Sequence, residues 1–239
     1  MAGFFEVSVN REDIKFHAAH FVAYKGFRER LHGHNYTVSV AMRGCAAVGS
    51  DWGGISHDGY VVDFGDIKAV ARRLCNELNE HLICPMRSDV LRITTIQLPV
   101  LASAGASAGA GDCGGTGMDG VDEREGEQAP LSREQVCIEC EDGATFSVPR
   151  SDVVMLPLVH STAEELAHYL WLRLVQEYGL QPLRTRRVAA LSVTVSEAPY
   201  QRATFTCELP EDEAALERMA AGPCPQKLSV RGCSERADD

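Results

Sequence analysis

Two histidines placed two residues apart constrain the fold of this chain more than any other feature. His32 and His34 stand at the start of a stretch that reads as a β-strand over residues 34–44, and on a strand side chains at i and i+2 point to the same face. The residues that follow with the same parity are apolar: Tyr36, Val38, Val40 and Met42. Both imidazoles are therefore predicted on the face that turns toward the core.

His20 is predicted on the same face. It stands twelve residues before His32 and alternates with Phe16 and Ala18 in an earlier extended segment. Three inward imidazoles on two neighbouring strands fit a zinc (Zn²⁺) site, because a catalytic zinc takes three protein ligands and keeps a fourth position open. The alternative is that each imidazole is a hydrogen-bonded histidine of the core.

The composition indicates a protein with a real core and no preference for polyanions. The chain has 239 residues, 45% of them hydrophobic, and a formal net charge of −11. This acidic balance argues against nucleic acid or an anionic membrane as the main partner. No apolar run reaches the length of a membrane span, and the first residues do not resemble a signal peptide, so we expect a cytoplasmic protein. Cys137 and Cys140 lie in an alternating stretch, which favours strand residues over a metal site.

The order of the predicted elements is that of an α+β protein. Extended segments over residues 4–20 and 34–44 precede a helix that begins near Phe64 and stops at Pro85. The later elements are a hairpin over residues 135–148, a helix closed by Gly179, a strand through Leu191, Val193 and Val195, and a returning strand from Arg202 to Leu209. We expect an antiparallel sheet with two helices packed on one face.

One domain is predicted over residues 1–209. Residues 103–132 are dominated by Gly, Ala, Ser and acidic residues and cannot bury enough apolar surface to offset their ordering entropy. They are interpreted as a disordered insertion within the domain rather than a linker between two domains. Residues 210–239 are acidic and then polar, and are predicted to form a flexible tail.

Five segments, taken together and in order, resemble the 6-pyruvoyl-tetrahydropterin synthase and 6-carboxy-tetrahydropterin synthase (QueD-like) family. They are residues 16–20 (FHAAH), 32–36 (HGHNY), 61–64 (VVDF), 161–166 (STAEEL) and 195–199 (VSEAP). The resemblance implies a T-fold, in which an antiparallel four-stranded sheet carries two helices on one face and the sheets of the subunits close into a barrel. It also implies a homo-hexamer built as a dimer of trimers, zinc on His20, His32 and His34, and a pterin site between subunits.

The loop before His32 departs from the usual pattern of that family, in which a nearby cysteine acts as the base. Residues 24–31 contain no cysteine, and the nearest acid is Glu29. This resembles a variant subgroup, including apicomplexan enzymes, with glutamate in place of that cysteine. The resemblance then implies cleavage of the side chain of 7,8-dihydroneopterin triphosphate to 6-hydroxymethyl-7,8-dihydropterin, a folate precursor. A carboxylate beside a Lewis-acidic zinc can accept a proton; the alternative is a solvated acid between Arg28 and Arg30.

Three further residues match positions of the family's pterin pocket. Glu197 falls on the apolar face of its strand by parity, where a carboxylate is costly unless it is paired. The amino group and ring N–H of a pterin would pair with it; the alternative is a structural salt bridge. Thr162 and Glu164 are the other two. Glu164 has a second interpretation, a capping box in which Ser161 caps the next helix and Glu164 reaches back.

Glu80 and His81 take the place of the Asp-His pair that ordinary members use as a proton relay. Counting back from Pro85 instead puts Asn79 and Glu80 there. Glu80–His81 is preferred, because a carboxylate beside an imidazole tunes its protonation. The alternative is that His81 lies at the end of the helix and interacts with its dipole.

These features together predict a zinc-dependent lyase that forms 6-hydroxymethyl-7,8-dihydropterin in folate biosynthesis. The first alternative is an ordinary 6-pyruvoyl- or 6-carboxy-tetrahydropterin synthase, the former eliminating triphosphate on a route toward tetrahydrobiopterin. The second is a non-catalytic pterin-binding T-fold protein.

Overall fold

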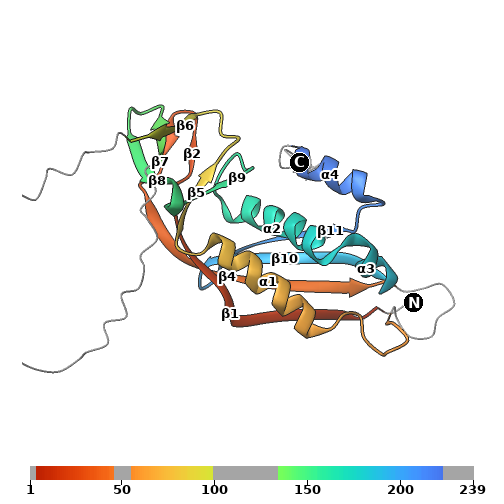
Figure 1. The fold of residues 1–239 in the computed structure, drawn as a ribbon. Coiled ribbons are helices and arrows are strands. Elements are labelled where there is room, and N and C mark those ends of the chain that lie inside the picture. Colours follow the sequence, from red (N-terminus) through yellow and green to blue (C-terminus); the bar gives the residue numbers. More distant parts are fainter. Residues whose placement is uncertain (1–3, 46–54, 99–133, 223–239) are drawn as a thin grey trace, which may run out of the picture.

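A six-stranded sheet forms the centre of the computed structural model, which describes residues 4–45, 55–98 and 134–222 (Figure 1). The strand order is β11–β10–β4–β1–β5–β9. The strands are β1 (Glu6–His20), β4 (His32–Gly44), β5 (His81–Pro85), β9 (Val153–Leu156), β10 (Val188–Ala198) and β11 (Gln201–Glu208). The β1–β4 register has an irregularity between Asn10 and Lys15.

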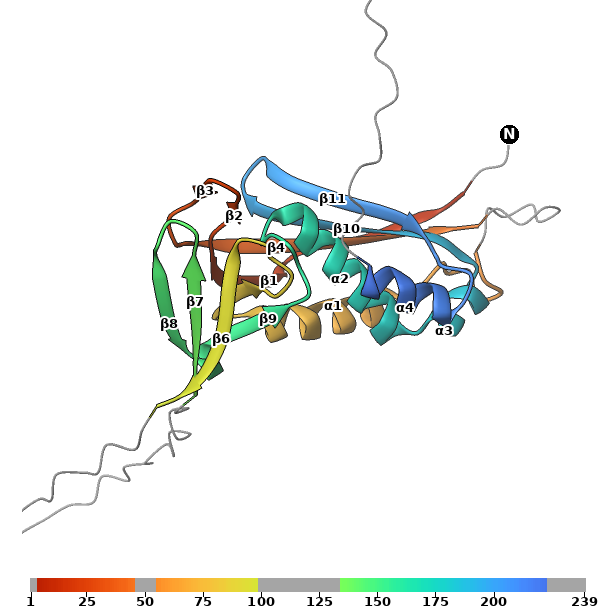
Figure 2. The same cartoon turned by 90° about the horizontal axis from the view of Figure 1, so that it is seen from above.

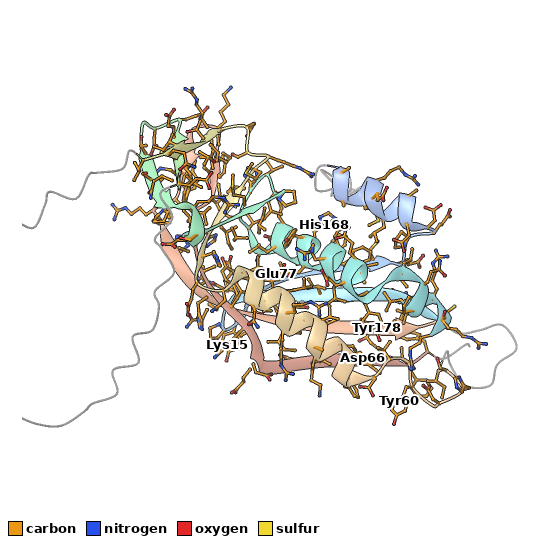
Figure 3. All side chains as sticks on the ribbon, viewed as in Figure 1. Lys15, Tyr60, Asp66, Glu77, His168 and Tyr178 are labelled. Atoms are coloured by element: carbon orange, nitrogen blue, oxygen red, sulfur yellow. The ribbon has the colours of Figure 1, made fainter. Side chains whose placement is uncertain are left out.

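Two long helices, α1 (Phe64–Leu78) and α2 (Ala163–Tyr178), lie side by side on one face of this sheet (Figure 1). Their apolar sides pack on β1, β10 and β11. Polar contacts join their outer sides: Arg173 lies 3.0 Å from Glu77, and the Tyr178 hydroxyl donates to Asp66 at 3.3 Å (Figure 3). The predicted layer of two helices on one sheet face is confirmed.

A smaller three-stranded sheet stands at one end of the molecule, beside a two-stranded hairpin (Figure 2). Its strands are β6 (Leu91–Gln97), β7 (Glu134–Cys140) and β8 (Thr145–Pro149), and the hairpin consists of β2 (Ala23–Tyr24) and β3 (Phe27–Arg28). A short 3-10 turn, η1 (Arg150–Asp152), leads from β8 into β9. A second apolar cluster, including Phe21, Leu82 and Ile138, joins these strands to the main sheet. The predicted hairpin over 135–148 and the strand interpretation of Cys137 and Cys140 are confirmed.

The prediction of a four-stranded antiparallel sheet is wrong in number and in direction. Strands β1, β4, β10 and β11 pair antiparallel as expected, but β5 and β9 extend the sheet in parallel. The predicted helix to Pro85 ends at Leu78, and Glu80 follows with φ 61°. Residues 82–85 are all buried in β5. A strand buried on both faces reads as a continuous apolar run, and such a short run also extends the apolar stripe of a preceding helix.

The predicted flexible tail contains a helix at its start. Helix α3 (Leu180–Thr185) precedes β10, and the last element of the described residues is α4 (Glu213–Ala221). Asp212 caps it by accepting from the Ala215 N–H at 2.7 Å, and Leu216 is buried in the core. The tail prediction therefore does not hold for these residues. The insertion predicted over residues 103–132 and the tail beyond residue 222 lie outside the described residues. Among the helices of the described ranges, none has the length and apolar character to cross a membrane.

His168 of α2 is a core histidine, and we predict that it makes stability depend on pH. It lies edge-on to Phe205, with 4.7 Å between ring centroids, and burial lowers its pKa from the usual 6.5 (Figure 3). The unfolded chain therefore binds a proton that the folded chain does not, so the free energy of unfolding falls as the pH drops below 6.5. His168→Gln should weaken this dependence in urea unfolding at a series of pH values. The exposed His57, changed to Gln, is the control, and an unaltered pH dependence in His168→Gln would refute the assignment.

Candidate functional site

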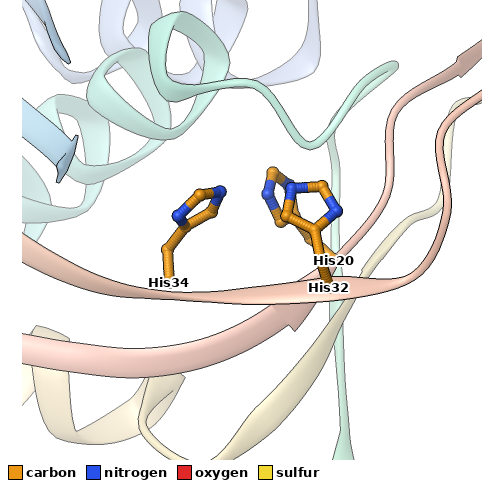
Figure 4. Close-up of side chains that lie close together, drawn as sticks. All are labelled: His20, His32 and His34. Atoms are coloured by element: carbon orange, nitrogen blue, oxygen red, sulfur yellow. The ribbon is translucent and has the colours of Figure 1, made fainter.

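Strands β1 and β4 bring the three predicted histidines together at one end of the sheet (Figure 4). His20 pairs directly with His32 in the antiparallel register, and Ala18 pairs with His34. One ligand nitrogen from each of the three rings lies within 4.8 Å of the other two. The face of β4 that carries His32 and His34 continues with buried residues, of which Tyr36 is the first and is fully buried. The three histidines form a cluster that can hold a metal ion.

Backbone carbonyls orient two of these rings. His20 Nδ1 lies 2.8 Å from the Ser161 carbonyl, and His32 Nδ1 lies 2.7 Å from the Arg30 carbonyl. A carbonyl only accepts, so we assign the ring proton to Nδ1 and a free lone pair to Nε2. His20 Nε2 is buried and has no hydrogen-bond partner among the described residues, and burial lowers the pKa of His20, which favours the neutral ring. The Nε2 atom of this neutral ring lies beside two other imidazoles. A metal ion bound there accounts for its lack of a hydrogen-bond partner better than the alternative of a hydrogen-bonded core histidine does.

A pocket of about 310 Å³ lies against His20 and His32. It is lined by four of the other predicted site residues, Glu29, Thr162, Glu164 and Glu197. The structure thus brings the loop before β4, the start of α2 and the end of β10 to the histidines of β1 and β4. Gln201 and Arg202 also line the pocket, and the sequence patterns did not single them out. Their position directly after the 195–199 motif could have indicated them. The β10–β11 hairpin turns there, so the residues that follow the turn return to the same end of the sheet.

Glu29 stands just before β4 and is held by a reciprocal pair of hydrogen bonds with Val22. The Val22 N–H donates to Glu29 Oε2 at 3.0 Å, and the Glu29 N–H donates to the Val22 carbonyl at 2.9 Å. Glu29 is half-buried, and within the described residues its Oε1 has no hydrogen-bond partner. One carboxylate oxygen is therefore anchored and the other is free in a pocket that His20 also lines, an arrangement unlike that of a solvated loop acid.

The cap of α2 differs from the predicted capping box by one residue. Thr162 is the N-cap, and its hydroxyl accepts from the Glu165 N–H at 3.4 Å. The Glu165 carboxylate accepts from two preceding backbone N–H groups at 2.7 and 3.1 Å. Ser161 is buried and donates its hydroxyl to the Phe21 carbonyl at 2.8 Å. Glu164 is therefore not part of the cap. Both registers match the Ser/Thr-x-x-Glu pattern, so the sequence allowed either.

Glu197 faces the same pocket from β10, beside Tyr36. The Tyr36 hydroxyl donates to Glu197 Oε1 at 3.4 Å, and burial together with this carboxylate raises the pKa of Tyr36 above its usual range. In the described part of the chain no lysine or arginine forms an ion pair with Glu197. The alternative that Glu197 forms a structural salt bridge is therefore not supported by the described residues.

Glu80 and His81 line a different cavity, of about 450 Å³, whose wall includes His34 and Asp152. His81 begins β5, so the alternative of a histidine at the C-terminus of a helix is wrong. His81 Nδ1 lies 2.6 Å from the Asn79 carbonyl, and in the described parts of the chain Nε2 has no hydrogen-bond partner. Within the described chain, the structure does not bring this pair into the pocket of Glu29.

The family model and the solved structures that match this chain agree on one enzyme family. The family model of 6-pyruvoyl tetrahydropterin synthase matches residues 8–208. A structure of 6-pyruvoyl tetrahydropterin synthase from Plasmodium falciparum is 32% identical, covering 86% of this chain and 99% of that chain with a TM-score of 0.66. The Plasmodium vivax structure is 35% identical, with coverages of 86% and 98% and a TM-score of 0.64. No curated protein matches the chain.

Two further Plasmodium vivax structures are catalytic-residue mutants, in which a glutamate is replaced by alanine or by cysteine. They show that the similar Plasmodium enzyme uses a glutamate as a catalytic residue. The family match covers the stretch from β1 to β11, including the histidine cluster and the pocket beside it. The chain therefore belongs to the 6-pyruvoyl tetrahydropterin synthase family, is similar to Plasmodium members of which one has a catalytic glutamate, and is a lyase-type enzyme.

Proposed function

We propose that this chain converts 7,8-dihydroneopterin triphosphate to 6-hydroxymethyl-7,8-dihydropterin with the help of zinc. The observation that carries the proposal is Glu29: a carboxylate with one free oxygen lies in the pocket that His20, His32 and Glu197 also line. A carboxylate and a thiolate differ in basicity and reach, so they favour removal of different protons of the same substrate. The carboxylate thereby selects cleavage of the side chain.

The histidine cluster would hold the metal through His20 Nε2, His32 Nε2 and a ring nitrogen of His34. Zinc bound there supplies a Lewis acid that lowers the proton affinity of the side-chain hydroxyls. The Ser161 and Arg30 carbonyls keep two of the rings in the tautomer that a metal needs.

Glu29 Oε1 is the atom that accepts the proton in this proposal. Loss of the proton from the second side-chain hydroxyl makes that carbon a carbonyl, and the bond to the first side-chain carbon breaks. The electron pair of that bond passes to the first carbon, where the pterin ring delocalises it, and a proton returns there to complete 6-hydroxymethyl-7,8-dihydropterin. The two hydrogen bonds to Val22 hold the base in place throughout.

Glu197 anchors the pterin ring, with Thr162 and Glu164 lining the same pocket. Its carboxylate can accept from the amino group and a ring N–H of the pterin together, which fixes the orientation of the ring. Tyr36 already donates to one of its oxygens and keeps the carboxylate turned into the pocket.

Glu80 and His81 serve as the proton relay only if a second subunit brings them to the pocket. Their cavity in one subunit is separate from that of Glu29. The proposal therefore includes a homo-oligomer, expected to be a hexamer, in which each site is completed between subunits. The proposed location of the enzyme is the cytoplasm.

A second candidate activity is 6-pyruvoyl-tetrahydropterin formation by elimination of triphosphate, which the names of the similar Plasmodium enzymes favour. Incubation of the purified, zinc-loaded chain with 7,8-dihydroneopterin triphosphate distinguishes the two, with products identified by mass. We expect 6-hydroxymethyl-7,8-dihydropterin. Formation of 6-pyruvoyl-tetrahydropterin alone would overturn the proposal.

Glu197→Gln should raise KM about 10- to 100-fold, because loss of a hydrogen bond to a charged group costs about 1.5–3 kcal/mol. Steady-state kinetics at several substrate concentrations measure this change, and kcat should fall less than kcat/KM. Glu208→Gln, an exposed acid at the end of β11, is the matched control. A Glu197→Gln enzyme with wild-type KM would show that the pterin is held elsewhere.

A further inference from the structure

The turn between β7 and β8 contacts the loop that carries Glu29, although more than a hundred residues separate them in sequence. Glu141 Oε2 accepts from the Gly26 N–H at 3.1 Å, and Asp142 Oδ2 accepts from Arg28 Nε at 2.7 Å. These contacts join the three-stranded sheet to the β2–β3 hairpin at one end of the molecule (Figure 2).

Arg28 extends this contact to Glu29 itself. Its Nη1 donates to the Glu29 carbonyl at 2.9 Å, so one guanidinium links Asp142 to the backbone of Glu29. The guanidinium also lies over the ring of Phe146, 5.6 Å from the centroid, and the Arg28 side chain is only 20% exposed. The Asp142 side chain is 46% exposed, so it is the three partners of the Arg28 guanidinium, and not burial of the pair, that distinguish this contact from an ordinary surface ion pair.

Asp142 is held in place for this contact by its own turn. Its Oδ1 accepts from the Ala144 N–H at 3.0 Å, and that hydrogen bond, followed by the one from Arg28, lowers the pKa of Asp142. Because the two carboxylate oxygens have different partners, the turn and the bridge to Arg28 can be separated by mutation.

We propose that Asp142 and Arg28 are positioning residues for Glu29, and that the three-stranded sheet acts as a brace for the catalytic loop. The inference rests on the proposed role of Glu29. The two hydrogen bonds with Val22 fix the Glu29 carboxylate relative to its own loop. The brace fixes that loop relative to the three-stranded sheet, so without it the loop, and Glu29 with it, shifts in the pocket. Since Glu197 rather than Glu29 holds the pterin ring, loss of the brace lowers kcat and leaves KM unchanged.

The test is an Asp142→Ser variant of the full, zinc-loaded enzyme. A serine hydroxyl can still accept from Ala144 but is too short to reach Arg28. We expect kcat to fall about 10- to 100-fold, the order of effect of a displacement of about 1 Å in a catalytic group. The matched control is Glu139→Ser on β7, which removes an exposed ion pair of the same sheet, 3.6 Å from Arg92, and should leave kcat unchanged.

A second comparison separates positioning of Glu29 from general damage. In a Glu29→Ala background, Asp142→Ser should lower the residual rate no further, because its target is already absent. An equal fractional loss in both backgrounds, or a wild-type kcat in Asp142→Ser, would overturn the brace. A Glu29→Ala enzyme that keeps the wild-type rate would instead show that the proposed role of Glu29 fails, and the brace with it.

Discussion

Glu29→Gln is expected to lower kcat by about 10²- to 10⁴-fold, the usual contribution of a positioned general base. The amide keeps the size of the side chain, and its oxygen can still accept from the Val22 N–H. It cannot accept the proton of a substrate hydroxyl at neutral pH. The fold and the loop are therefore retained while the proposed chemistry is lost, and steady-state kinetics on 7,8-dihydroneopterin triphosphate measure the difference.

The control for this prediction is Glu217→Gln, which removes the charge of an exposed acid on α4. Its kcat and KM should equal those of the wild type. If Glu29→Gln were also fully active, the base would have to come from another group, and the cavity of Glu80 and His81 would be the next place to search.

Removal of the metal should have an effect of the same order. His20→Ala deletes one of the three proposed metal ligands, a buried imidazole whose Nε2 has no hydrogen-bond partner in the described residues. Loss even of an outer-shell partner of a metal site usually costs about 10- to 100-fold in affinity or activity, so loss of a ligand should cost at least about 100-fold. Metal content by mass spectrometry and activity with added zinc measure this. Chelation of the wild type should abolish activity, and zinc should restore it.

The exposed His57 provides the control, because His57→Ala removes an imidazole outside the cluster. This variant should keep a full complement of zinc. A His20→Ala enzyme with wild-type zinc content and activity would show that the cluster is not a metal centre, and would favour a pterin-binding role that needs no metal.

The histidine cluster could be predicted from sequence because it depends on a local geometric rule. Side chains alternate along a strand whatever the rest of the chain does, so His34 shares a face with Tyr36 and the apolar residues after it. The direct pairing of His20 with His32 follows from the register of β1 and β4, which the shared apolar face specifies.

The end of α1 and the cap of α2 were predicted wrongly because, at each place, the sequence fits two local patterns equally well. The apolar run at residues 82–84 continues the stripe of α1 and equally suits a strand buried on both faces, and the packing of β5 between β1 and β9 decides the matter. Ser161 and Thr162 each precede a glutamate by three residues, and only the buried bond from Ser161 to Phe21 selects Thr162 as the cap.

Other features depend on contacts between distant segments. Strand β6 pairs with β7, whose residues lie beyond the low-complexity stretch, so no local signal joins them. Helix α4 has one buried residue, Leu216. A single buried position does not form the periodic pattern from which an amphipathic helix is predicted. The brace from Asp142 to Arg28 belongs to the same class, because charge pairs across such a distance leave no pattern in a single sequence.

The central claim is that the residue at position 29 decides which bond of the substrate breaks. The most direct measurement compares the products that the zinc-loaded wild type and Glu29→Cys form from 7,8-dihydroneopterin triphosphate. We predict 6-hydroxymethyl-7,8-dihydropterin from the wild type and a shift toward 6-pyruvoyl-tetrahydropterin in the cysteine variant. The same product distribution from both active enzymes would contradict the claim.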